Sequence, residues 1–210
     1  MSKQEDIVKL FCEECVWMHA IRQHFRDLFE SGELRRNLLT EISKGFFGDL
    51  NIVLQEYILL QKAKITDPAS SGKGKENLSS NYLVSLNWSP PVEAELKALN
   101  DRLMGFRAKI DDARRKYLAH ADLSSHLAQT KLGDFSEAEE QDFWSALQDF
   151  VNIAHEATFG GPYPIDAVQV DGDVQSLMHA LVGAADYSDL VENEEGFLYR
   201  RFVKQRYKNA

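Results

Sequence analysis

The sequence predicts an all-α protein, an up-and-down helical bundle with long antiparallel helices. Apolar residues recur at spacings of three and four over long stretches, which is the helical period. The segments between these stretches are short and contain Gly and Pro, and no segment alternates as a strand does, apart from a weak hint at residues 165–170. Long helices with short connections pack as antiparallel neighbours. With 210 residues, 44% of them hydrophobic, the chain can bury one substantial core.

The first half of the chain contains two long helices and one short helix. Residues 5–30 carry apolar stripes at helical spacing, and residues 33–64 form a second helix that is long for a globular protein. The stretch 67–75 contains Pro68 and two glycines, which end this helix, and we expect a flexible loop there. A short helix follows at residues 78–86.

The second half of the chain begins with the longest apolar seam. A helix over residues 91–119 starts after Ser89-Pro90-Pro91, because Ser caps free amides and Pro is tolerated in the first turn. Its seam ends on a histidine and consists of Leu96, Leu99, Leu103, Phe106, Ile110, Ala113, Tyr117 and His120. Ser136 followed by acids starts another helix, which Gly160-Gly161-Pro162 ends, and a last helix covers residues 173–190.

The charge of the chain is unevenly distributed. Residues 132–199 contain no Lys or Arg and fifteen acids, whereas the rest of the chain carries all 24 basic residues with the other 18 acids. This stretch is either a solvated acidic surface or a face that repels nucleic acid towards the basic side. We expect residues 1–159 to form the bundle and residues 160–210 a helical extension packed on the same domain.

The sequence favours a cytoplasmic protein with no membrane partner, no cofactor and no metal. The N-terminus is polar without a signal-peptide pattern, and no apolar run approaches the length of a membrane span. Cys12 and Cys15 form a C-x-x-C pair with His19 four residues later, but a structural zinc needs about four ligands. The pair also lies in the middle of a helix, so we expect buried, reduced cysteines.

The candidate active site is the stretch that contains Arg114, Arg115 and His120. An imidazole on a buried seam, with two arginines just before it, suggests an anionic ligand such as phosphate. In an ideal helix Arg114 lies about 120° and Arg115 about 140° around the axis from His120. A site therefore requires distortion of the helix end, arginines that fold back, or a second chain. The structural alternative is that these residues complement the helix dipole and cap the last carbonyls.

The residues around this stretch resemble those of a known family. Arg114 and Arg115 precede His120 by five and four intervening residues, which resembles the Arg-to-His hallmark of the HEPN family. More specific is the combination with Asp67-Pro68 after the second helix, Lys75-Glu76-Asn77-Leu78-Ser79 before the short helix, and Arg-Arg-Lys-Tyr-Leu-Ala-His-Ala-Asp at the end of the long one. Together they resemble the abortive-infection U-type branch of HEPN proteins over about residues 5–159.

The resemblance implies a metal-independent endoribonuclease that acts as a homodimer in phage defence or a toxin–antitoxin system. RNA supplies its own 2′-hydroxyl nucleophile, so the protein provides proton transfer and neutralises charge on the phosphorane. It implies that His120 transfers the proton, that Arg114 or Arg115 binds phosphate, and that Lys116 or Tyr117 contacts the substrate. An antitoxin protein is a further expected partner, and the acidic stretch 132–199 is then its docking surface if the antitoxin is basic.

The alternative class is a non-catalytic helical dimer that binds a partner protein or nucleotide. HEPN proteins often have Asn or Asp directly after the arginine, whereas this chain has Arg115 or Lys116 there. This missing polar residue, together with the uneven charge, favours the alternative.

Overall fold

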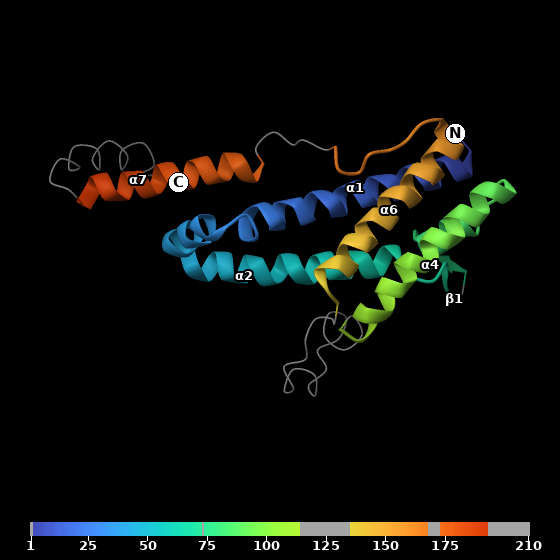
Figure 1. The fold of residues 1–210 in the computed structure, drawn as a ribbon, viewed down its shortest axis with the longest axis horizontal. Helices are drawn as coiled ribbons and strands as arrows, with labels where there is room; N and C mark the ends of the chain where they lie inside the picture. Colours follow the sequence, from blue (N-terminus) through green and yellow to red (C-terminus); the bar gives the residue numbers. More distant parts are fainter. Residues whose placement is uncertain (1, 73, 114–134, 168–172, 193–210) are drawn as a thin grey trace. The chain divides into compact units, whose positions relative to one another are not determined.

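The computed structural model describes residues 2–72, 74–113, 135–167 and 173–192, and over these ranges the protein is helical apart from one two-stranded sheet (Figure 1). The predicted all-α class is confirmed. Within the same ranges, no helix combines the length and apolarity that a membrane span requires.

The chain divides into two compact units. Unit 1 consists of residues 1–23 and 53–168, and unit 2 of residues 24–52 and 169–210. The long helices α1 (Lys3–Phe29) and α2 (Glu33–Ile65) contribute to both units. The expected boundary after residue 159 stays a prediction.

Unit 1 is built around the packing of α4 (Pro90–Ala113) on α6 (Glu137–Phe159). Phe106 of α4 lies 4.8 Å from Phe143 of α6 between ring centroids, and Phe11 of α1 lies 5.7 Å from Phe150. The predicted seam of α4 is confirmed as far as the description extends: its buried members are Leu96, Leu103, Phe106 and Ile110. Burial of apolar surface from three helices therefore forms the core of this unit.

The ends of α6 follow the sequence signals closely. At its start, the Ser136 hydroxyl accepts from the Glu139 amide at 3.3 Å, while the Glu139 carboxylate accepts from the Ser136 amide at 2.8 Å, which completes a capping box. At its end, Gly160 adopts a φ of 77°, which favours glycine. The chain then returns along α6, where the side-chain amide of Gln148 binds the Tyr163 carbonyl and the Ile165 amide, both at 2.9 Å.

A small antiparallel hairpin, which the sequence did not predict, forms in the stretch between the second helix and the short helix. It pairs β1 (Ser70–Gly72) with β2 (Lys75–Glu76) and leads into α3 (Ser80–Val84). The hairpin forms because Asn77 closes it: its side-chain amide donates to the Pro68 carbonyl at 2.7 Å and accepts from Ser71 Oγ at 2.8 Å. Glycine and polar residues marked a turn in the sequence, but the pattern did not show that Asn77 would bind residues six and nine positions before it.

Unit 2 joins the end of α1, the first half of α2 and α7 (Val174–Glu192). Arg35 of α2 donates to the Asp27 carbonyl near the end of α1 and to Gln175 Oε1 of α7, the latter at 3.3 Å. Asp173 caps α7 by accepting from the Gln175 amide at 2.9 Å. The sequence predicted one continuous second helix, whereas Ser43 has non-helical torsions (φ −163°, ψ 80°) that kink α2.

Candidate functional site

The residues that the sequence places in the active site lie outside the described residues. These are Arg114, Arg115, Lys116, Tyr117 and His120. Their mutual geometry therefore stays a prediction. The structure does describe α4 up to Ala113, the residue immediately before Arg114, and so shows how the approach to this motif is built.

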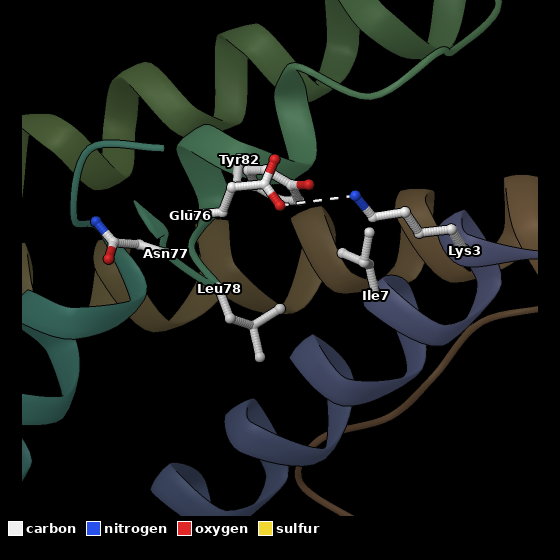
Figure 2. A pocket seen from close by; sticks show the side chains of 6 residues that line it. All are labelled: Lys3, Ile7, Glu76, Asn77, Leu78 and Tyr82. Atoms are coloured by element: carbon white, nitrogen blue, oxygen red, sulfur yellow. Dashed lines mark ion pairs between the residues drawn. The ribbon is translucent and has the colours of Figure 1, made fainter. Parts of the chain in front are cut away.

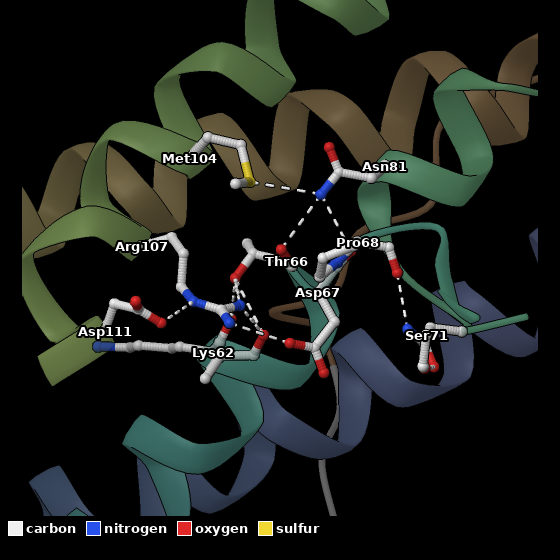
Figure 3. A network of polar contacts seen from close by, with 11 residues as sticks. Lys62, Thr66, Asp67, Pro68, Ser71, Asn81, Met104, Arg107 and Asp111 are labelled. Atoms are coloured by element: carbon white, nitrogen blue, oxygen red, sulfur yellow. Dashed lines mark hydrogen bonds and ion pairs between the residues drawn. The ribbon is translucent and has the colours of Figure 1, made fainter. Parts of the chain in front are cut away.

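A buried arginine fastens the end of α2 to the last described turns of α4 (Figure 3). Arg107 is only 7% exposed. Its Nη1 donates to the Ala63 carbonyl and, at 3.0 Å, to Thr66 Oγ1, and its Nη2 donates to Asp67 Oδ1 at 3.0 Å. Its Nε lies 3.4 Å from Asp111 Oδ1, one turn further along α4. The guanidinium group thus donates hydrogen bonds to the C-terminal end of α2 and to the carboxylate of Asp67 at the same time.

The same helix end is closed from the other side by Asn81 of α3. Its Nδ2 lies 3.1 Å from the Thr66 carbonyl and 3.0 Å from the Asp67 carbonyl, so it serves backbone acceptors that α2 leaves unpaired. Asn100 of α4 in turn donates to Asn81 Oδ1 at 3.0 Å. We call the set Thr66, Asp67, Asn81, Asn100 and Arg107 the α2–α4 clamp.

Three of the residues that carried the family resemblance have structural roles in this region. Asp67 is the carboxylate that pairs with Arg107. Asn77 closes the hairpin, and Ser79 caps α3 by accepting from the Tyr82 amide at 3.3 Å. These residues therefore shape the region where α2, α3 and α4 meet.

Sequence reasoning missed Arg107, although a signal was present. Steps of four and three from Leu96 reach Asn100, Leu103, Arg107 and Ile110, so the two clamp residues of α4 alternate with buried apolar residues on the packed face of the helix. Polar side chains at buried positions need partners. That requirement, applied to the sequence, would have singled out this pair.

A second buried cation, Lys62, lies in a cage of aromatic rings. Lys62 is 1% exposed, and its ammonium pairs with Glu140. Four ring centroids lie 5.0–5.7 Å from its Nζ, those of Phe106, Phe135, Phe143 and Trp144. Burial lowers the pKa of Lys62, and Glu140 counteracts only part of this effect.

Glu140 is the hub of this cluster. It accepts from Trp144 Nε1 at 3.3 Å and lies 3.9 Å from Arg22 Nε, in addition to its pair with Lys62. Burial favours the protonated carboxyl, but the attraction of Lys62, together with these hydrogen bonds, outweighs it and lowers the pKa of Glu140.

Part of the acidic stretch is neutralised by ion pairs with basic residues of the same chain. Glu139 pairs with Lys109 at 2.8 Å, and Asp142 pairs with Arg102, so both acids join α6 to α4. The hydrogen bond from Lys109, followed by those from Ser136, lowers the pKa of Glu139 to about 2. Glu139, Glu140 and Asp142, three of the fifteen acids of this stretch, are therefore paired with basic residues of neighbouring helices.

The cysteine pair is buried, as expected from the sequence. Cys12 and Cys15 are free thiols in the core of unit 1, and burial raises the pKa of Cys12 to about 12 and that of Cys15 well above its usual value. The His19 ring meets Trp144 edge-on at 5.6 Å. In the part of the chain that the structure describes, no group of three or more His, Cys, Asp or Glu side chains could hold a metal ion.

A family model identifies both the HEPN class of this protein and the family within that class. The all-α fold and the matched family model identify a HEPN-class protein. The model that matches is HEPN_AbiU2, described as AbiU2, over residues 1–177, and the chain therefore belongs to this family. The match continues past residue 159, where the resemblance in the sequence ended, into α7. No curated protein and no solved structure matches the chain significantly.

Proposed function

We propose that this protein is a metal-independent endoribonuclease that cleaves RNA, in phage defence or a toxin–antitoxin system. Membership of the HEPN_AbiU2 family supports this role. The observation that carries it is the motif from Arg114 to His120, which follows directly on a helix whose preceding turns are anchored by Arg107 and by the buried Ile110. Active sites need supporting residues of this kind to hold reactive groups in place.

The proposed chemistry uses only groups that the motif contains. An imidazole removes the proton of the 2′-hydroxyl, and the oxygen attacks the adjacent phosphorus. The bond to the 5′-oxygen breaks, this oxygen takes a proton from a second imidazole, and a 2′,3′-cyclic phosphate remains. His120 of two chains would supply base and acid, which is why we propose a homodimer. Arg114 or Arg115 neutralises the phosphorane oxygens, and Lys116 or Tyr117 contacts the RNA.

The test is cleavage of total RNA or tRNA by the full-length protein in EDTA. We expect cyclic-phosphate ends, and a loss of at least about 100-fold in rate for His120→Ala, the lower end of the usual contribution of an acid–base group. The matched control is His179→Ala, which removes an exposed histidine of α7 and should leave the rate unchanged. Separate Arg114→Ala and Arg115→Ala variants identify the phosphate ligand. Unchanged cleavage by folded His120→Ala protein would refute the assignment.

A second candidate function is a non-catalytic helical dimer that binds a partner protein or nucleotide. It is favoured by large apolar side chains of unit 1 that stay more than half exposed, namely Leu10 and Trp17 of α1 and Val53 of α2. Trp17 Nε1 donates to the Tyr57 hydroxyl at 2.8 Å, which places this indole beside α2. A dimer in sedimentation analysis that leaves every RNA intact, with and without Mg²⁺, would favour this function over the nuclease.

A further inference from the structure

Unit 1 contains a pocket of about 180 Å³ where the start of α1 faces β2 and α3 (Figure 2). Its lining residues are Lys3, Ile7, Glu76, Asn77, Leu78 and Tyr82. Pockets for drug-sized ligands measure roughly 300–1,000 Å³. This pocket therefore suits a group of about one ring system, with the rest of the ligand outside.

The wall formed by Asn77 is held in place by the hairpin. Both ends of its side-chain amide are engaged, by the Pro68 carbonyl and Ser71 Oγ, and its backbone amide donates to the Ala69 carbonyl at 2.9 Å. Asn77 is thus a fixed surface rather than a ligand-binding group. A wall that is already ordered lowers the entropy cost of binding.

The pocket combines apolar walls with two opposite charges. Leu78 is 37% exposed and Ile7 is half-buried, so both leave apolar surface uncovered. Lys3 Nζ lies 3.6 Å from Glu76 Oε2, which exceeds a normal hydrogen bond, so both groups keep capacity for a ligand. Glu76, followed by Tyr82, raises the pKa of Lys3, which stays an ammonium. A carboxylate that only accepts thus stands beside an ammonium that only donates.

We propose that this pocket binds a guanine base. The Watson–Crick edge of guanine presents two neighbouring donors, N1–H and the N2 amino group, next to the O6 acceptor. Glu76 can accept from both donors while Lys3 donates to O6, and the ring lies against Ile7, Leu78 and Tyr82. The base comes either from a free guanine nucleotide or from an unpaired guanosine in RNA, and the RNA source rests on the proposed function.

The same geometry discriminates against the other bases. Adenine and cytosine each place an unprotonated ring nitrogen beside their amino group, which would direct a lone pair at the Glu76 carboxylate. Uracil offers a single donor between two acceptors. A matched pair of hydrogen bonds to a base edge discriminates against the wrong base by about fivefold or more in nucleic-acid recognition. We therefore expect at least about fivefold preference for guanine.

The experiment is a calorimetric titration of the full-length protein with GMP, AMP, CMP and UMP in EDTA. GMP should bind at least about fivefold more tightly than AMP. Glu76→Gln keeps the size of the side chain but replaces one acceptor by a donor, which fits the acceptor and donor edge of adenine, so this ratio should fall to about one or below. Glu95→Gln removes the same charge from an exposed position on α4 and should keep the preference. Circular dichroism confirms that each variant is folded.

A second arm distinguishes the two sources of the base. Short single-stranded oligoadenylates with and without one guanosine are titrated into His120→Ala protein, in which we expect the RNA to remain intact. Preference for the guanosine-containing oligomer indicates RNA, whereas preference for GMP alone indicates a free nucleotide. Equal binding of all four nucleotides, no binding, or a preference that survives Glu76→Gln would overturn the proposal. Because no cleavage is measured, a failed nuclease assay leaves this result unaffected.

Discussion

Removing either partner of the buried pair Lys62–Glu140 should destabilise unit 1, and loss of Glu140 should destabilise it more than loss of Lys62. Glu140→Gln leaves the ammonium of Lys62, 1% exposed, without a countercharge. Loss of one member of a buried pair costs about 3–5 kcal/mol, and we expect about 3 kcal/mol here because Lys62 can relieve part of the cost by releasing its proton. Its pKa is already lowered by burial.

Removing the lysine of the pair instead should lower the free energy of unfolding by less. Lys62→Met leaves Glu140, whose side chain is 29% exposed and still meets Trp144 Nε1 at 3.3 Å and Arg22 at 3.9 Å. We expect a loss of about 1 kcal/mol. The double variant removes both charges and should lie within about 1 kcal/mol of the wild type, since neutral replacement of a buried pair is often tolerated. The cycle then gives a coupling energy of about 3 kcal/mol.

The assay is urea unfolding followed by tryptophan fluorescence. All three tryptophans, Trp17, Trp88 and Trp144, belong to unit 1, so the signal reports this unit. The control is the exposed ion pair Lys109–Glu139, which also joins α4 to α6. Lys109→Met and Glu139→Gln should each change the free energy of unfolding little. Equal effects of Glu140→Gln and Lys62→Met, or an additive double variant, would refute the reasoning.

The dependence on pH has a defined sign. The folded pKa of Lys62 lies below its ordinary 10.5, so the unfolded chain binds more protons between these values and stability rises with pH through that window. Glu140→Gln should widen this window because the countercharge is gone. The folded pKa of Glu140 lies below 4.5, so its contribution is complete above about pH 4.5 and is lost as the pH falls through the lowered value. The double variant should show neither dependence.

Two further predictions follow from other buried groups. Arg107→Met should cost about 3 kcal/mol in the same unfolding assay because it leaves the Asp67 carboxylate and the Ala63 carbonyl without the guanidinium, and Arg107→Lys should recover only part, since an ammonium cannot reproduce the fork. Similar stability of the Lys variant and the wild type would contradict this role. Cys12, whose pKa burial raises to about 12, should react with a thiol reagent at pH 8 only in urea, and rapid labelling of the native protein would contradict its burial.

Local patterns in the sequence predicted most of the helices. The apolar seam of α4 lies in the core because one face of a helix must be buried, whatever it packs against. The capping signal at Ser136 works through residues three apart and therefore needs no partner from elsewhere. The kink at Ser43 was not foreseen, since neither Pro nor a break in the pattern marks it.

The tertiary structure decided which polar residues are buried and what they bind. The sequence does not show what Arg107 and Lys62 bind, since Asp67 lies 40 positions from the one and Glu140 lies 78 positions from the other. Contacts over such separations depend on how α2, α4 and α6 pack, and no local period records them. The sequence by itself determined the helices, the family and the motif from Arg114 to His120. The clamp, the caged lysine and the pocket exist only because the fold brings distant side chains together.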